Sequence, residues 1–247
     1  MLLYSPIWQT PGTVAITYDD GPIGDYTSHI LDVFKTYNAK ATFFITGNNI
    51  NKGQIDVASS GFIPVIKRMY SEGHQIASHT WTHLDLSAVS SVDRKNQMYK
   101  LEMALRNILG FFPTYMRPPY SSCTAASGCE ADMRSLGYHV TYFDVDTDDY
   151  NQATPTNIQK SKNWFRGNIT QGGAKPATDE WLAIAHDIHY QTAYNLTDYM
   201  LSTLTQLGYR AVTVGECLGD PVANWYRSSS GSTTPGTSTR ASSSTVS

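Results

Sequence analysis

Cysteine is scarce in this chain, with three among 247 residues. Cys123 and Cys129 lie in the loop-like stretch SSCTAASGCE, at a spacing that is poor for a zinc site. A local disulfide between them is one interpretation and would leave Cys217 without a partner, whereas three reduced thiols are the other. The cysteines therefore argue against a cysteine-bound metal.

An excess of positive charge and long apolar runs are also missing. The formal net charge is −3, which favours neither nucleic acid nor an anionic membrane as a partner. No apolar run approaches the length of a membrane span. We therefore expect no nucleic-acid partner and no membrane span.

Nothing at the start of the chain has the length of a signal-peptide core, because Met1–Leu3 is followed at once by Tyr, Ser and Pro. The protein is then either cytosolic or secreted with its signal removed. The tripeptides that begin at Asn168 and Asn195 fit the N-glycosylation pattern and lean toward secretion.

What the chain does have is 40% hydrophobic residues, arranged in alternating strand-like and helix-like segments. We expect strands at 14–17, 41–46, 75–78, 114–117, 139–143, 181–185 and 210–213. We expect helices at 26–37, 62–72, 92–109, 131–136, 158–165 and 195–207. Such repeats without a glycine-rich dinucleotide fingerprint predict an α/β fold with a parallel sheet closed, or nearly closed, into a barrel. An open doubly wound sheet is the alternative.

The composition changes near the end of the chain. From Ser228 onward the sequence SSSGSTTPGTSTRASSSTVS consists almost entirely of Ser, Thr, Gly and Pro. Such a segment has too little apolar surface to offset the entropy of ordering. We therefore predict a folded domain over 1–227 and a disordered Ser/Thr-rich tail or linker over 228–247.

Reactive side chains follow strand after strand at their predicted carboxyl ends, where function gathers in parallel α/β folds. They are Asp19 and Asp20, His79 and His83, Arg117, the acids of FDVDTDDY, and His186. Each motif alone is weak, but five at the same end of consecutive strands are hard to attribute to chance.

Two adjacent acids at the end of a buried strand repel each other unless a cation gathers them. HTWTH supplies His79 and His83, which would share one face if the segment turned as a helix. Two imidazoles and one carboxylate form a divalent metal site with open positions for water and substrate. Zinc suits this donor set best, and iron or cobalt is also accepted.

The ordered motifs TYDDGP, HTWTH, RPPY, FDVDTDDY and IAHDIH resemble those of the polysaccharide deacetylases of carbohydrate esterase family four, with the greatest similarity to fungal chitin deacetylases. The resemblance covers about residues 11–227. It implies a distorted (β/α)7 barrel with the active site at the C-terminal ends of the strands, and a polysaccharide deacetylase catalytic domain over 1–227.

The resemblance also implies roles at the acids and the metal. Asp19 would be the general base, and Asp20 with His79 and His83 would hold Zn²⁺, with Co²⁺ as an alternative. Arg117 would pair with Asp19, keeping that carboxylate ionised and aimed.

For the other steps, the backbone N–H of Tyr120 would hold the developing oxyanion. His186 would protonate the leaving amine, and Asp146 would orient and charge that histidine. We choose Asp146 over Asp144 because Asp146 matches the aspartate position of the family's aromatic-x-x-Asp pattern.

Four residues are expected at the substrate. The family often has Trp where this chain has Phe143 and Tyr150; Tyr150 can still wall an acetyl-methyl pocket with Ile184 opposite, if its hydroxyl finds a partner. Pro119 and Trp81 complete the expected set, although Trp81 fits a core role equally well. His189 and Tyr190 fit a sugar subsite and a packed or solvated role equally well.

The resemblance implies hydrolysis of N-acetyl groups from N-acetylglucosamine units of chitin or chitooligosaccharides, with release of acetate, by a secreted or cell-wall monomer. An acetylxylan esterase or a peptidoglycan N-acetylglucosamine deacetylase would share the chemistry. A non-catalytic wall-binding protein is a third class, but it would not need Asp19, Arg117 and His186 together. The acid at His186 favours amides, since an amine leaves only when protonated.

Overall fold

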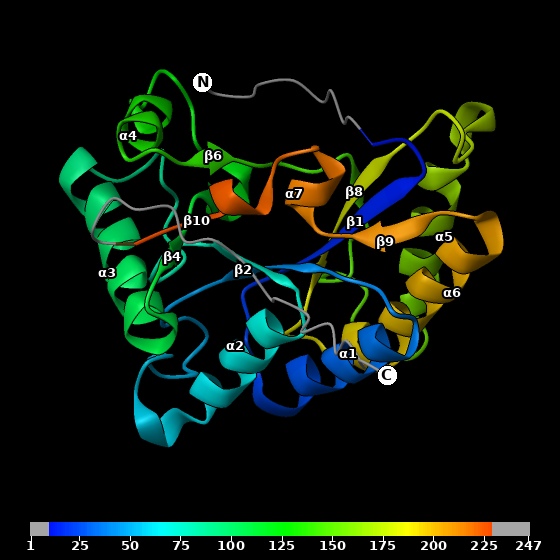
Figure 1. Cartoon of the computed structure of the whole chain (residues 1–247), viewed down its shortest axis with the longest axis horizontal. Helices are drawn as coiled ribbons and strands as arrows, with labels where there is room; N and C mark the ends of the chain where they lie inside the picture. The colour runs from blue at the N-terminus through cyan, green and yellow to red at the C-terminus, as the bar shows by residue number, and fades with distance from the viewer. Residues whose placement is uncertain (1–9, 229–247) are drawn as a thin grey trace, which may run out of the picture.

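A parallel sheet runs through the centre of the computed structural model, which describes residues 10–228 (Figure 1). The strand order is β6-β5-β3-β2-β1-β8-β7, and β9 pairs with β1 beside this path. The strands are β1 (Thr13–Asp19), β2 (Thr42–Ile45), β3 (Gln75–Ser78), β5 (Tyr115–Met116), β6 (His139–Val140), β7 (Val145–Asp146), β8 (Trp181–His186) and β9 (Arg210–Val212). The parallel α/β architecture predicted from the repeats is therefore confirmed.

The central strand β1 brings two predicted site residues, Asp19 and His186, next to each other. Its sequence TVAITYD is rich in β-branched residues, and every residue is buried because helices and loops cover both faces. It pairs with β8 in a register that runs from Val14 opposite Trp181 to Asp19 opposite His186. Residues 167 positions apart in the chain thus stand side by side at the carboxyl edge of the sheet.

The barrel is incomplete between β6 and β7. These strands form the two ends of the sheet order, yet residues 141–144 join them directly in the chain. The side chain of Arg117 reaches this connection, where Nε donates to the carbonyl of Thr141 (3.4 Å) and Nη2 to that of Tyr142 (3.1 Å). Side-chain hydrogen bonds thus bind this connection where the barrel lacks strand pairing, and the half-barrel agrees with the predicted distorted (β/α)7 fold. The strand expected at 139–143 is correspondingly shorter.

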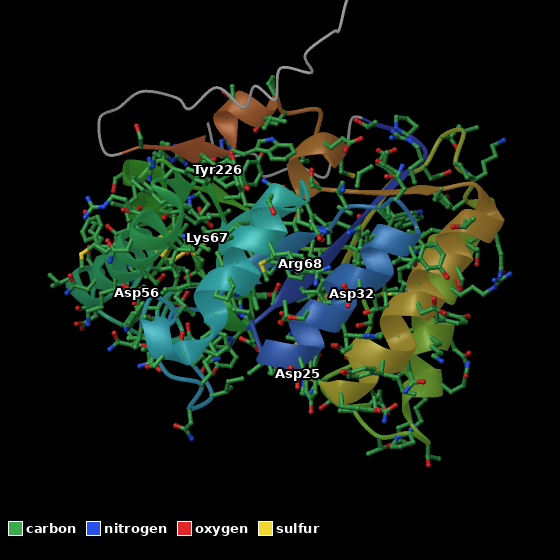
Figure 2. All side chains as sticks on the ribbon, turned by 60° about the horizontal axis from the view of Figure 1, so that its bottom comes forward. Asp25, Asp32, Asp56, Lys67, Arg68 and Tyr226 are labelled. Atoms are coloured by element: carbon green, nitrogen blue, oxygen red, sulfur yellow. A yellow bond between two sulfur atoms is a disulfide. The ribbon has the colours of Figure 1, made fainter. Side chains whose placement is uncertain are left out.

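The larger helices surround the sheet in the order α4-α3-α2-α1-α6-α5 (Figure 1). They are α1 (Gly24–Thr36), α2 (Phe62–Ser71), α3 (Ser91–Leu109), α4 (Cys129–Ser135), α5 (Ile158–Ile169) and α6 (Thr197–Leu207). Figure 2 shows α2 beside α1, where Arg68 pairs with Asp32 at 2.6 Å. A π-helical turn, η4 (Thr192–Leu196), precedes α6 where the sequence predicted an ordinary helix start.

The last part of the described chain forms a second, two-stranded sheet. Helix α7 (Val214–Cys217) follows β9, and β10 (Tyr226–Arg227) pairs antiparallel with β4 (Phe112–Pro113). The predicted tail over 228–247 lies outside the described residues, apart from Ser228. In the part that is described, no helix has the length and apolar character needed to cross a membrane.

Two hydrophobic clusters fill the interior. The larger lies between the sheet and the helices, and the smaller surrounds the disulfide between Cys123 and Cys129, whose Cα atoms are 5.1 Å apart. The predicted local disulfide is therefore confirmed. Cys217 is a buried free thiol whose sulfur lies 3.4 Å from the hydroxyl of Thr13.

Candidate active site

A cavity of about 630 Å³ lies at the carboxyl ends of the central strands. Most residues predicted for the site line it, from strands that are distant in sequence but adjacent in the sheet. The lining residues are Asp19, Asp20, His79, His83, Arg117, Pro118, Tyr120, Ser121, Phe143, Asp146, Tyr150, Ile184, His186, Ile188 and His189. The expectation that reactive side chains gather at this edge agrees with the geometry.

Asp20, His79 and His83 form one cluster. Each offers a ligand atom, and these three atoms lie within 4.8 Å of one another. Nδ1 of His79 is 2.8 Å from the carbonyl oxygen of Arg117, which can only accept, so Nδ1 carries the proton and Nε2 is free to bind a cation. Burial also lowers the pKa of His79 to about 3, which favours the neutral imidazole that a metal requires.

The HTWTH segment reaches this geometry without forming a helix, contrary to the conditional prediction. Thr80 and His83 have left-handed backbone angles, with φ of 72° and 58°. The Thr80 hydroxyl accepts the His83 N–H at 3.1 Å and so stabilises the bend. The two imidazoles converge through this bend, with ring centroids 4.9 Å apart.

Asp20 is held in place by contacts that the sequence did not reveal. The backbone of Asp20 is left-handed (φ 77°), and its main-chain carbonyl accepts hydrogen bonds from the Thr46 hydroxyl (2.5 Å) and from the ammonium of Lys52 (2.7 Å). The amide of Asn49 donates to its Oδ1 at 3.3 Å. Thr46, Asn49 and Lys52 follow β2, and no pattern in that stretch singled them out.

The neighbouring acid Asp19 has a different partner. Its Oδ1 accepts from Nη1 of Arg117 at 2.7 Å, and both side chains are buried. Burial raises the pKa of Asp19, and the charge of Arg117 opposes that rise. The ion pair predicted from the resemblance is present, and it points the carboxylate into the cavity.

Asp149, and not Asp146, is the partner of His186, so the prediction of Asp146 is wrong. Oδ1 of Asp149 lies 2.7 Å from Nδ1 of His186, and Oδ2 accepts the backbone N–H of His186 at 2.7 Å and the hydroxyl of Thr192 at 2.6 Å. The left-handed backbone of Asp148 (φ 51°) reverses the chain after β7. This turn carries Asp149 into the core, where it is completely buried.

The charge of Asp149 determines the protonation of His186. Burial alone would lower the pKa of His186, but the adjacent carboxylate outweighs this and raises the pKa to about 9. Burial alone would raise the pKa of Asp149, but the charge of His186 and the hydrogen bonds from His186 and Thr192 outweigh this and lower it. The Asp149 carboxylate therefore favours the protonated imidazolium of His186, in which Nε2 is a second donor.

Asp146 instead supports the wall of the cavity. It accepts the backbone N–H of Asp148 at 2.7 Å and the hydroxyl of Tyr150 at 3.3 Å. The Tyr150 ring stands edge-to-face with His186, with centroids 5.3 Å apart. The hydroxyl partner that Tyr150 required is therefore Asp146, and Ile184 lines the same cavity.

Trp81 and Pro119 are not among the cavity-lining residues. A Cβ on Gly47 would lie 1.9 Å from the Trp81 ring, so Trp81 packs directly on that glycine against the main core. Pro119 is buried, and Pro118 lines the cavity in its place. Tyr120 lines the cavity with a left-handed backbone (φ 58°), and its ring meets His83 edge-to-face.

The donor set fits a divalent cation, since one carboxylate and two imidazoles converge beside a second, arginine-paired acid. A charged histidine stands across the same cavity. A parallel α/β half-barrel with these groups at its carboxyl edge has the features of a metal-dependent hydrolase.

The chain belongs to the polysaccharide deacetylase family. The family model matches residues 9–141. A chitin deacetylase of Colletotrichum lindemuthianum is 44% identical over 225 residues, which cover 90% of this chain and 87% of that protein. A solved structure of the chitin deacetylase from the same fungus superposes with a TM-score of 0.81 at 43% identity, covering 89% of this chain and 92% of that one.

A second relative is named for a different substrate. A probable peptidoglycan-N-acetylglucosamine deacetylase of Arthroderma benhamiae is 43% identical over 229 residues, which cover 92% of this chain and 49% of that protein.

Proposed function

We propose that this protein hydrolyses N-acetyl groups of N-acetylglucosamine units in chitin or chitooligosaccharides and releases acetate. The observation that carries the proposal is the hydrogen bond between His186 and Asp149 across the cavity from Asp19. A protonated histidine fixed there supplies the acid that an amide needs and an ester can do without. The similarity to a fungal chitin deacetylase supports chitin as the substrate.

Asp20, His79 and His83 would hold the metal, which we propose to be zinc, with cobalt as a substitute. When bound, such a cation supplies Lewis acidity toward an acyl oxygen and lowers the pKa of water. The second acid, Asp19, accepts a proton from the attacking water while the water oxygen bonds to the carbonyl carbon of the acetamide. Arg117 aims that carboxylate, and the backbone N–H of Tyr120 is the proposed donor to the developing oxyanion.

Cleavage of the C–N bond then requires a proton on nitrogen. Nε2 of His186 gives its proton to the leaving amine, so the products are acetate and a free amino sugar. Tyr150 and Ile184 would flank the acetyl methyl group, since both line the cavity and Tyr150 stands against His186.

We also propose that residues 1–227 form the catalytic domain of a secreted or wall-located monomer. The last strand of the described residues ends at Arg227, and the Cys123–Cys129 disulfide is typical of an oxidising compartment. Mass spectrometry of protein from a eukaryotic secretory host would test glycosylation at Asn168 and Asn195.

The test is acetate release from chitooligosaccharides and from acetylxylan, each with and without chelator. We expect acetate to be released from the chitooligosaccharides, and we expect the chelator to abolish this release. Faster release from acetylxylan would contradict the assignment to an amide substrate.

Peptidoglycan is the second candidate, favoured by the relative of Arthroderma benhamiae. It presents the same acetamide, so the residues at the reacting bond do not distinguish it from chitin. Parallel rates on peptidoglycan fragments would decide between them.

A further inference from the structure

Four aromatic rings form an ordered cluster outside the residues assigned to the reaction. Tyr26 and His29 come from α1, and Tyr190 and Tyr194 come from the segment that follows His186. The ring of Tyr194 is stacked on Tyr190 (centroids 4.5 Å apart, interplanar angle 25°) and on His29 (4.1 Å, 19°). We call these four residues the ring stack.

The geometry leaves one face of Tyr190 uncovered by the other rings. A ring has two faces, so His29 and Tyr190 cover opposite faces of Tyr194, and Tyr190 ends the stack. Tyr26 is nearly equidistant from Tyr190 and Tyr194, at 5.9 and 6.1 Å, and perpendicular to both. It therefore lies beside the stack and not over its end. Tyr190 is 53% exposed although two other rings contact it.

The ring-stack residues do not themselves line the catalytic cavity, but the segments that carry them start beside it. Strands β1 and β8 are paired, with Asp19 opposite His186, so the segments that follow them emerge side by side. Helix α1 begins at Gly24, near Asp25 in Figure 2, and carries Tyr26. On the other segment, His189 lines the cavity with its ring 6.2 Å from that of His186, and Tyr190 is the next residue.

The segment that carries the stack is also fixed from within. Thr192, between the two tyrosines, is buried and donates its hydroxyl to Asp149 at 2.6 Å. The tyrosines on either side of Thr192 face outward, with Tyr194 36% exposed. The segment that carries Tyr190 and Tyr194 is thus anchored to the same carboxylate that charges His186, and a ligand binding to a fixed segment would lose little conformational entropy.

We propose that the ring stack is a distal subsite that binds an N-acetylglucosamine ring of the polymer beyond the unit being deacetylated. The proposal rests on the proposed function. The C–H groups on one face of a pyranose carry partial positive charge and pack on the electron-rich face of Tyr190, while the phenol oxygen stays at the wet rim. Exposed aromatic area on the residue next to the cavity-lining His189 fits an extended chain of sugars.

The test compares a hexamer of N-acetylglucosamine with the dimer, using acetate release to measure kcat and KM. We expect Tyr190→Ala to raise KM for the hexamer about tenfold, the order that stacking on one aromatic ring supplies, with little change in kcat. The kcat/KM for the dimer should stay within about twofold of the original protein. Tyr190→Phe keeps the ring and should keep the hexamer KM.

Tyr99→Ala is the matched control, because Tyr99 is a 45% exposed tyrosine on α3 that does not line the cavity. An unchanged hexamer KM in Tyr190→Ala overturns the subsite. An equal loss on dimer and hexamer also overturns it, because that result indicates a general disturbance of the cavity.

Failure of the proposed function gives a different result. If the unaltered protein releases no acetate from either oligomer, the proposed function fails whatever Tyr190 does. Hexamer affinity measured by calorimetry on Asp19→Asn, with and without Tyr190→Ala, then tests the subsite without turnover. Weaker binding in the double variant supports the subsite, and equal binding overturns it.

Discussion

At the scale of single residues, adjacent acids divide their contacts. Asp20 lies 3.2 Å from Nε2 of His83, whereas Asp19 pairs with the guanidinium of Arg117 at 2.7 Å. Nε2 of His79 is nearly equidistant from the two acids, 3.7 Å from Asp19 and 3.8 Å from Asp20. A carboxylate beside imidazoles that can bind a metal is suited to be a metal ligand. A carboxylate paired with arginine is suited to be a general base. The backbone is left-handed at Asp20, and there the arginine contact of Asp19 and the His83 contact of Asp20 diverge.

This division predicts separable effects of two isosteric changes. Asp20→Asn should weaken metal binding, since a neutral amide is a poorer ligand than a carboxylate. Asp19→Asn should retain the metal yet lose about 10²–10⁴-fold in rate, as expected when a general base is removed. Metal content by atomic emission and acetate release measure the two effects. Equal metal loss in both variants would show that the roles are misassigned.

The His186–Asp149 pair predicts a contrast between substrates. Asp149→Asn should lower amide hydrolysis by about 10²–10⁴-fold, because the neutral side chain no longer keeps His186 protonated. An activated aryl acetate, whose leaving group needs no proton, should be affected much less.

Asp146→Asn is the matched control for that experiment. Asp146 contacts Tyr150 and not His186, so its change should leave the ratio of amide to aryl acetate rates near the original. A larger effect of Asp146→Asn than of Asp149→Asn on that ratio would contradict the pairing seen in the structure.

His74 predicts a stability that depends on pH. Its Nδ1 accepts the N–H of Ala41 at 3.0 Å, and burial lowers its pKa to about 3. The unfolded chain binds a proton at this histidine near pH 6.5 and the folded chain does not, so unfolding becomes easier as the pH falls below about 6.5. The slope from this group is about 1.4 kcal/mol per pH unit down to about pH 3.

Urea unfolding between pH 7 and pH 4 measures that slope. In His74→Asn an amide oxygen can accept the same N–H without titrating, so the variant should lose this part of the pH dependence. An identical slope in both proteins would exclude His74 as its source.

At the scale of elements, Arg117 connects parts of the fold that strand pairing leaves apart. Its guanidinium bonds to Asp19 and Thr17 on β1 and to two carbonyls in the connection between β6 and β7. It also lies over the ring of Phe44, 4.1 Å from the centroid. One buried side chain thus serves both the base and the closure of the half-barrel.

Arg117→Met should therefore destabilise the fold as well as reduce activity. Removing one member of a buried ion pair leaves Asp19 uncompensated, at a cost of about 3–5 kcal/mol. The same change in an Asp19→Asn background should cost less, because no buried charge is then left alone. Equilibrium unfolding of the four proteins gives the coupling energy, and a coupling near zero would contradict this account.

At the scale of the whole molecule, the cluster of Asp20, His79 and His83 lies at the edge of the hydrophobic core and is not part of it. Asp20, His79 and His83 lie at the carboxyl ends of β1 and β3, whereas the large hydrophobic cluster lies between the sheet and the helices. Loss of the metal should then affect the reaction more than the fold.

Chelation should abolish acetate release while far-UV circular dichroism stays close to that of the untreated protein. Added zinc or cobalt should restore activity, and His83→Ala should need a higher metal concentration for the same recovery. Full activity in chelated protein with no bound metal would exclude the metal-dependent mechanism.

The sequence alone predicted the α/β class, the alternation of strands and helices, and the acids and imidazoles of the metal cluster. These features depend on local periodicity and on motif order, both of which are written along the chain. Strand β3 (QIAS) occupies the predicted residues 75–78, because a short segment between a glycine turn and a polar loop is too short to form a helix.

Only the tertiary structure decided which acid of FDVDTDDY meets His186. The direction of each side chain there depends on where β7 stops and on the left-handed turn at Asp148, and neither is visible in a run of alternating acids. The contacts of Lys52 with the Asp20 backbone and of Arg117 across the barrel gap were likewise hidden, because each joins segments distant in sequence. A local pattern specifies secondary structure, but a partner across the fold is determined by packing, which orients each buried polar group toward the atom that can satisfy it.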